Sequence, residues 1–73
     1  MMKKTELRVG GLHCPSCSML VEMTLEEIGG VVSADCEQAT GATVVEYEEQ
    51  AVDVGRLVEA IRSIGYTAEA ARG

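Results

Sequence analysis

Apolar and polar side chains alternate at the start of the chain, from Thr5 to Val9. In a β-strand successive side chains point to opposite faces, so Leu7 and Val9 would lie on the same side. The pattern therefore predicts a half-buried strand, which Gly10 and Gly11 bring to an end.

The next apolar residues recur at the spacing of a helix. Pro15 suits the first turn of a helix, where its missing N–H costs no hydrogen bond. One helical face collects Val21, Leu25 and Ile28, with Thr24 beside them. The sequence thus predicts a helix from Pro15 to Ile28, ended by Gly29 and Gly30.

Two strand-like segments follow. The first runs from Val31 to Glu37. Its inward side is expected to carry Val32, Ala34 and Cys36. The second is the β-branched run from Ala42 to Tyr47, and turn-forming residues at 39–41 separate the two segments.

A second helix and a last short strand complete the pattern. Asp53 is a suitable N-cap for this helix. Its core-facing side would carry Leu57, Ile61 and Ile64. Gly65 caps the helix, and Tyr66 to Ala70 can form a strand. The order β-α-β-β-α-β predicts an α+β, ferredoxin-like sandwich: a four-stranded antiparallel sheet with two helices on one face.

Length and composition restrict what such a fold can do. We expect the 73 residues to form a single domain, 1–73, and at this size binding or carrying is favoured over multistep catalysis. The apolar fraction of 47%, with no Phe, no Trp and two Tyr, indicates a globular chain with an aliphatic core. The net charge of −6 argues against nucleic acid or an anionic membrane as partner, because both require a basic face.

The three cysteines are an odd number, which a disulfide framework does not predict. No stretch is long and apolar enough to span a bilayer, and the amino terminus has no apolar signal region. We therefore expect a cytoplasmic protein without membrane insertion, in a reducing compartment where thiols bind metals or do redox chemistry.

The candidate chemistry lies in Cys14-Pro15-Ser16-Cys17, at the junction of the first loop and the first helix. The partial positive charge of a helix N-terminus favours thiolate over thiol. Thiolates are soft ligands that select Cu(I), Zn(II) and similar ions. Two thiolates suit Cu(I) and fall short of the four ligands of structural zinc sites. A C-x-x-C pair alone also allows redox chemistry, half of a zinc site, or coincidence.

The surrounding sequence resembles a known family. Gly11-Leu12-His13-Cys14-Pro15-Ser16-Cys17 is similar to the G-M-x-C-x-x-C motif of the heavy-metal-associated (HMA) domain family. The likeness continues through Val21-Glu22, Leu25, Gly30-Val31, Ala39-Thr40-Gly41, Val45-Glu46-Tyr47, Leu57, Ile61 and Gly65-Tyr66-Thr67-Ala68.

This resemblance covers nearly the whole chain and implies both fold and activity. It implies a ferredoxin-like domain that captures one soft metal ion through Cys14 and Cys17 and passes it on by ligand exchange. Family members are free metallochaperones or amino-terminal domains of metal-transporting P-type ATPases, so the implied partner is one or the other. We expect a monomer, or a metal-bridged dimer.

Four further residues bear on the metal site that the resemblance implies. Leu12 replaces the family's usual Met, a volume-conserving change expected below the loop. His13 is a candidate third ligand, which would favour Zn(II) or Cd(II); the alternative is a solvated loop side chain. Tyr66 resembles an aromatic residue near the metal loop, where it would shield the thiolates or cover the core. Cys36 is expected in the core as a small apolar residue rather than a ligand.

Other functions fit the sequence less well. A Zn(II), Cd(II) or Hg(II) domain of the same family is the main alternative to Cu(I). Pro15 also allows the C-P-x-C of glutaredoxin-like oxidoreductases, but these resemble a longer fold with a further cis-proline, and the chain has one proline. A domain that zinc merely holds together would unfold without metal. We expect a protein that is not an enzyme.

The exposed side of the first helix is unusually apolar. Met19, Leu20 and Met23 lie nearly opposite the core face, one to two turns from Cys17. A contiguous apolar patch indicates an interaction surface, and Met suits an adaptable one. We expect this patch to be a docking surface for the partner. Its predicted acidic border consists of Glu22, Glu26 and Glu27.

Overall fold

The computed structural model describes residues 2–13 and 16–72, so Cys14 and Pro15 lie outside the described part of the chain. The elements follow the predicted order along the chain. They are β1 (Met2–Gly10), α1 (Cys17–Glu26), β2 (Val31–Cys36), β3 (Ala42–Glu48), α2 (Val54–Ser63) and β4 (Thr67–Arg72).

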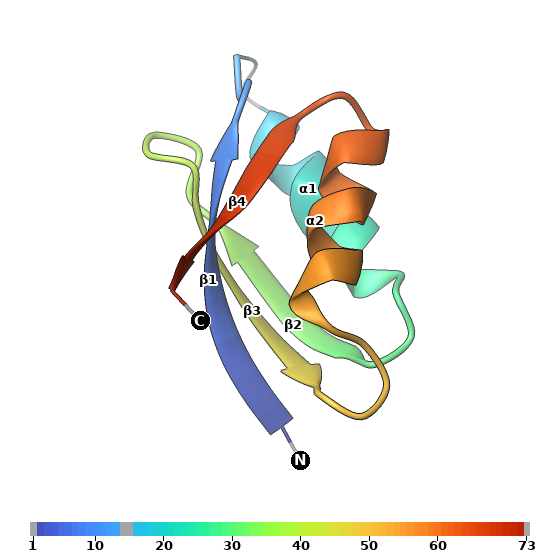
Figure 1. Cartoon of the computed structure of the whole chain (residues 1–73). Helices are drawn as coiled ribbons and strands as arrows, with labels where there is room; N and C mark the ends of the chain where they lie inside the picture. Colours follow the sequence, from blue (N-terminus) through green and yellow to red (C-terminus); the bar gives the residue numbers. More distant parts are fainter. Residues whose placement is uncertain (1, 14–15, 73) are drawn as a thin grey trace.

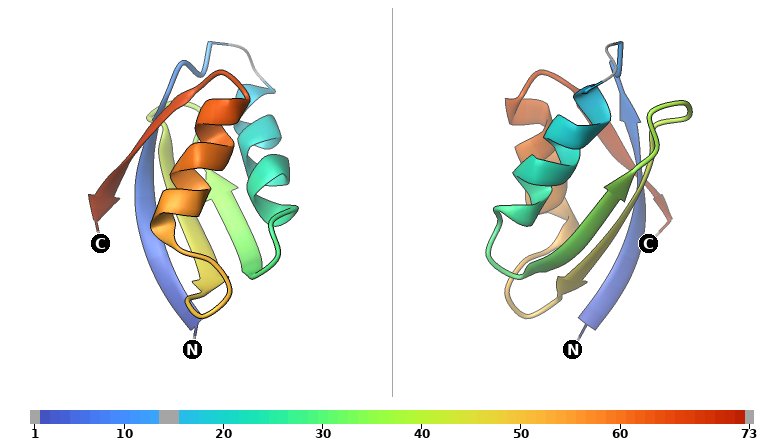
Figure 2. Two further views of the ribbon diagram at one scale, coloured as in Figure 1. Left: turned by 45° about the vertical axis from the view of Figure 1, so that its right-hand side comes forward. Right: turned by 180° about the vertical axis from the view of Figure 1, so that it is seen from behind.

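The four strands form one antiparallel sheet in the order β2-β3-β1-β4. Both helices lie on the same face of this sheet (Figure 1). Figure 2 shows the same two layers after a turn of 45°, with the helices in front of the sheet, and from behind. Helix α1 packs over β2, and α2 packs over β4. The predicted ferredoxin-like fold class is confirmed.

The core fills the space between the helices and the sheet. Leu7 of β1, Leu25 of α1 and Leu57 of α2 are fully buried there. The whole cluster is aliphatic apart from one aromatic ring and one thiol: Leu7, Val9, Val21, Leu25, Ala34, Cys36, Val45, Tyr47, Val52, Leu57, Ala60 and Ile61. Burial of such apolar surface is the main favourable contribution to folding.

The start of α2 follows the prediction. The Asp53 carboxylate accepts a hydrogen bond from the backbone N–H of Arg56 at 2.9 Å, which satisfies one of the unpaired donors of the first turn. Leu57 and Ile61 are fully buried, and Ile64 packs against the core from its edge.

The prediction for β2 was wrong at Val32, which is 57% exposed. The pairing between β2 and β3 shifts between Val31 and Ser33, so Val32 is an additional residue opposite β3. An inserted residue of this kind reverses the side on which the preceding residues face. Beyond it, Ala34 and Cys36 face the core as expected.

Helix α1 is shorter than predicted, because it ends at Glu26 rather than Ile28. The N–H of Ile28 bonds to the carbonyl of Leu25 at 3.0 Å, a tighter turn than an α-helix makes. The Ile28 side chain still packs against the core.

Several loops meet at one end of the molecule, at the top in Figure 1. The end of β1, the start of α1 and the α2–β4 connection lie there (Figure 2). The β2–β3 turn joins them, because the N–H of Val9 donates to the carbonyl of Gly41 at 2.9 Å. This end of the fold carries the candidate site.

Candidate metal centre

Cys17 is the first residue of α1, and its side chain is only 2% exposed. The backbone N–H groups at a helix start point outward from the first turn and favour negative charge beside them. The start of α1 therefore favours a negatively charged group beside it. The other predicted thiol, Cys14, lies outside the described residues, so the structure does not test the pair.

A shallow groove of about 300 Å³ opens beside Cys17. It is lined by Ser16, Cys17, Met19, Leu20, Met23 and Tyr66. Three of these side chains are the predicted apolar patch, and they are exposed by 59%, 43% and 56% in chain order. The structure thus places the patch directly against Cys17.

Tyr66 reaches the groove from the α2–β4 connection. Its ring also lies close to Gly11, in the loop before the motif. If Gly11 carried a Cβ atom, that atom would lie 3.3 Å from Tyr66 Cδ1. The ring is half-buried and packs on the core as well. Tyr66 therefore lies both at the groove and over the core.

Leu12 is half-buried and packs against the core below the loop. Its carbonyl accepts a hydrogen bond of 3.0 Å from Gln38 Nε2. The other end of the same amide, Gln38 Oε1, accepts the N–H of Ser18 at 3.0 Å. Sequence reasoning missed Gln38, and no local signal indicates it, because its partners are 26 and 20 residues away.

His13 is exposed and turned toward its own loop. Its Nδ1 lies 2.7 Å from the carbonyl oxygen of Gly11. Because a carbonyl oxygen only accepts, Nδ1 carries the proton, and in a neutral ring Nε2 is left as the atom able to bind a metal. A histidine ligand is usually oriented by such a contact at its other nitrogen.

The predicted acidic border of the patch is partly wrong. The carboxylate of Glu22 accepts the backbone N–H of Cys36 at 2.7 Å, so it ties α1 to β2 instead of lying free beside the patch. Glu26 and Glu27 are exposed, as expected.

Cys36 is a free cysteine in the core and 6% exposed. Burial is the main cause that raises the pKa of its thiol, and the negative charges of Glu22 and Asp35 raise it further. A hydrogen bond with Thr43 acts in the opposite direction. A thiol held in this neutral form is a poor soft-metal ligand.

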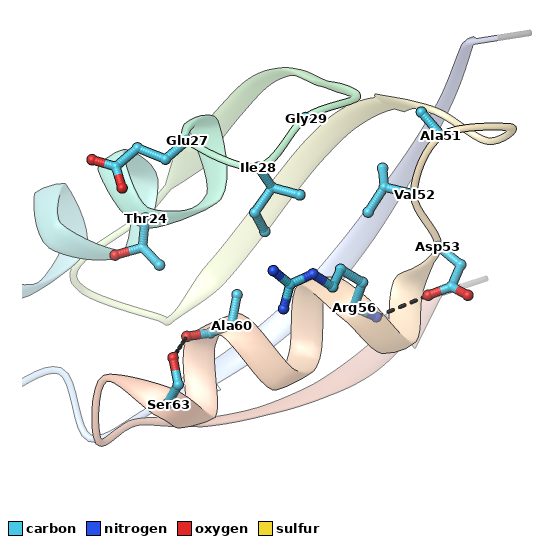
Figure 3. Close-up of a pocket in the computed structure, with 10 residues that line it drawn as sticks. All are labelled: Thr24, Glu27, Ile28, Gly29, Ala51, Val52, Asp53, Arg56, Ala60 and Ser63. Atoms are coloured by element: carbon cyan, nitrogen blue, oxygen red, sulfur yellow. Dashed lines mark hydrogen bonds between the residues drawn. The ribbon is translucent and has the colours of Figure 1, made fainter.

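A larger hollow of about 580 Å³ lies between the helices, beside the α1–β2 loop (Figure 3). Arg56, Asp53 and Glu27 are its charged lining residues. Within residues 2–13 and 16–72, no three His, Cys, Asp or Glu side chains converge in a way that could hold an ion. The hollow therefore offers no second metal site among these residues.

The chain is similar in sequence to proteins that handle metal ions. A copper chaperone, CopZ of Staphylococcus aureus, is 37% identical over 65 residues, which are 89% of this chain and 96% of CopZ. A zinc-transporting ATPase of Synechocystis sp. is 36% identical over 66 residues, or 90% of this chain, but the chain spans only 9% of that ATPase.

Solved structures give the same picture. The Cu(I)-loaded N-terminal domain of a potential copper-translocating P-type ATPase from Bacillus subtilis superposes with a TM-score of 0.92 at 30% identity, covering 99% of this chain and 90% of that domain. In the described part of the chain, neither helix has the length and hydropathy needed to cross a membrane. The sequence model of the heavy-metal-associated domain matches residues 6–67, and the chain belongs to that family.

Proposed function

We propose that this domain binds one soft metal ion, Cu(I) before others, between Cys14 and Cys17 and transfers it to a partner protein. The observation that carries the proposal is the position of Cys17, which begins α1 and lines an open apolar groove. The helix N-terminus favours the thiolate, and soft thiolate ligands favour Cu(I). The domain would bind and deliver metal without catalysing a reaction.

Transfer would proceed by ligand exchange. A metal held by two thiolates has room for a third, so a partner's cysteine can bind before one of the domain's cysteines leaves. The ion is never released to water, and a tight site can still deliver its cargo. Both relatives named above handle metal ions, one as a chaperone and one as a transporter, which supports this class of function.

The partner would dock on the patch formed by Met19, Leu20 and Met23. These side chains line the groove next to Cys17, so a protein seated on them could reach the metal. Burying exposed Met side chains on association is favourable, and their flexibility adapts to the partner. The matching partner is a soft-metal domain: a metallochaperone, or the metal-binding domain of a P-type ATPase.

The test uses the three cysteines as matched variants. Reduced protein competes with a chromophoric Cu(I) chelator in the absence of oxygen. Cys14→Ser and Cys17→Ser should each abolish tight binding, because one thiolate remains. Cys36→Ser should keep the affinity of the wild type. An equal loss in all three variants would contradict the assignment.

A second candidate cargo is Zn(II), with His13 as third ligand. The orientation of the His13 ring favours it, because the contact with Gly11 leaves Nε2 available. His13→Ala should then weaken Zn(II) binding about tenfold or more and leave Cu(I) binding almost unchanged. Unchanged Zn(II) affinity would remove His13 from the site.

The docking role is tested separately. Changing Met19, Leu20 and Met23 together to Gln should slow metal transfer to a partner domain. Metal affinity and thermal stability should stay near those of the wild type, because these side chains are exposed. Unchanged transfer kinetics in a folded triple variant would exclude the patch from the mechanism.

A further inference from the structure

The Gln38 side chain joins the chain segments before and after the Cys14–Cys17 motif. Its Nε2 donates to the carbonyl of Leu12, and its Oε1 accepts the N–H of Ser18, both at 3.0 Å. Leu12 precedes the motif, and Ser18 follows it in the first turn of α1. One planar amide therefore bridges the two chain segments between which the motif cysteines lie in the sequence.

The turn that carries Gln38 is itself held firmly. Within it, the N–H of Gly41 bonds to the carbonyl of Glu37, and the N–H of Glu37 bonds to the carbonyl of Ala42, both at 2.8 Å. The Val9 N–H bonds to the carbonyl of Gly41 at 2.9 Å, which fastens the turn to the end of β1. These hydrogen bonds fix the backbone of the turn from which the Gln38 side chain extends. The Gln38 side chain is itself half-buried.

We propose that Gln38 is a positioning residue for the metal site: it holds the loop and the start of α1 at the separation the two thiolates need. The inference rests on the proposed function. Without this contact, the loop would have to be ordered when the metal binds, and the lost conformational freedom would lower the affinity. The contacts that orient ligands at metal sites have effects of this kind.

The Ser18 contact has a further consequence. The N–H of Ser18 is one of the unpaired donors of the first turn of α1, and Gln38 supplies its acceptor from a distant part of the chain. Gln38 thereby fixes the start of the helix on which Cys17 stands.

The test compares Gln38→Met with the matched control Gln50→Met. Met keeps the length of Gln38 but can neither donate nor accept these bonds, whereas Gln50 lies exposed in the β3–α2 turn. Cu(I) affinity is measured by chelator competition, and the thermal midpoint of the metal-free protein is measured in parallel. Amide hydrogen exchange at Ser18 gives a readout without metal, with the capped N–H of Arg56 as internal control.

We expect Gln38→Met to bind Cu(I) about tenfold more weakly, the usual scale for losing a contact that orients a ligand. Exchange at Ser18 should become faster while exchange at Arg56 does not change, and Gln50→Met should match the wild type. A lower thermal midpoint with unchanged Cu(I) affinity would show a purely structural role and overturn the inference.

Gln38→Asn gives a second route to the same answer if the Met variant does not fold. Asn keeps the amide on a stem shorter by one methylene, so it cannot reach both partners, and it should also lose affinity. Wild-type affinity in Gln38→Asn would overturn the inference and leave the proposed function intact. A wild-type protein that binds no soft metal would overturn both.

Discussion

Three glycines allow the energetics of the β2–β3 turn to be tested by graded substitution with Ala. Gly29 lies outside the left-handed region, and a Cβ there would meet nothing within 4 Å. Gly65 has φ +95 but also open space around it. Gly41 has φ +79, and a Cβ there would overlap the carbonyl oxygen of Val9 and lie 3.2 Å from its carbon.

These environments predict an order of stability. Gly29→Ala should be neutral or stabilise the fold by up to about 1 kcal/mol, because it restricts the unfolded chain. Gly65→Ala should cost about 1–2 kcal/mol for the left-handed backbone. Gly41→Ala adds a clash with backbone that cannot rotate away and displaces the Val9–Gly41 hydrogen bond, so about 3–4 kcal/mol is expected.

The whole fold has only about 4–11 kcal/mol of stability at 0.05–0.15 kcal/mol per residue, so the last change removes a large share. Urea unfolding followed by far-ultraviolet circular dichroism gives the free energy of unfolding of each variant. In a parallel thermal unfolding experiment, each kcal/mol of lost stability should lower the midpoint by about 4–8 °C. If Gly41→Ala loses no more stability than Gly65→Ala, the β2–β3 turn can shift to accommodate the Cβ at little energetic cost. The conclusion that this turn holds Gln38 rigidly would then be wrong.

Three further predictions follow from the structure. Asp53→Ala should cost about 0.5–2 kcal/mol in urea unfolding, because it removes the cap on Arg56 N–H. Stability should fall as the pH rises above about 9, since the unfolded chain loses the Cys36 proton there while the folded chain, whose thiol pKa is raised, keeps it. Cys36→Val should reduce that alkaline loss in pH-dependent unfolding; an unchanged profile would exclude Cys36 as its source. Treatment with a strong chelator should leave the circular dichroism spectrum unchanged, and unfolding would instead indicate a structural metal.

Much of the fold could be predicted from local patterns. Alternation at Leu7 and Val9 and the cap at Asp53 each act within a few residues, so the sequence contains the whole signal. The side on which Val32 lies could not be predicted, because the bulge depends on how β2 pairs with β3.

Some features of the candidate site could also be predicted from the sequence, and others depend on contacts that exist only in the folded chain. The Cys14–Cys17 spacing and the apolar patch are visible in the sequence, although the ligand pair itself remains a prediction. The bond from Glu22 to Cys36 N–H could not be anticipated, since it exists only once α1 packs on β2. Gln38 was missed for the same reason: a polar residue in a turn gives no sign of a partner 26 residues away.

The distribution of buried groups explains how such a domain could release metal without losing its fold. The core cluster joins both helices to the sheet and, among the described residues, takes no member from the loop at 11–13. We therefore expect the folding energy to come mainly from the burial of core residues such as Leu25 and Leu57. The loop is joined to this core by Leu12 and to the β2–β3 turn by Gln38. Because these links lie outside the core cluster, we expect changes in them to alter the metal affinity while the core keeps its stability.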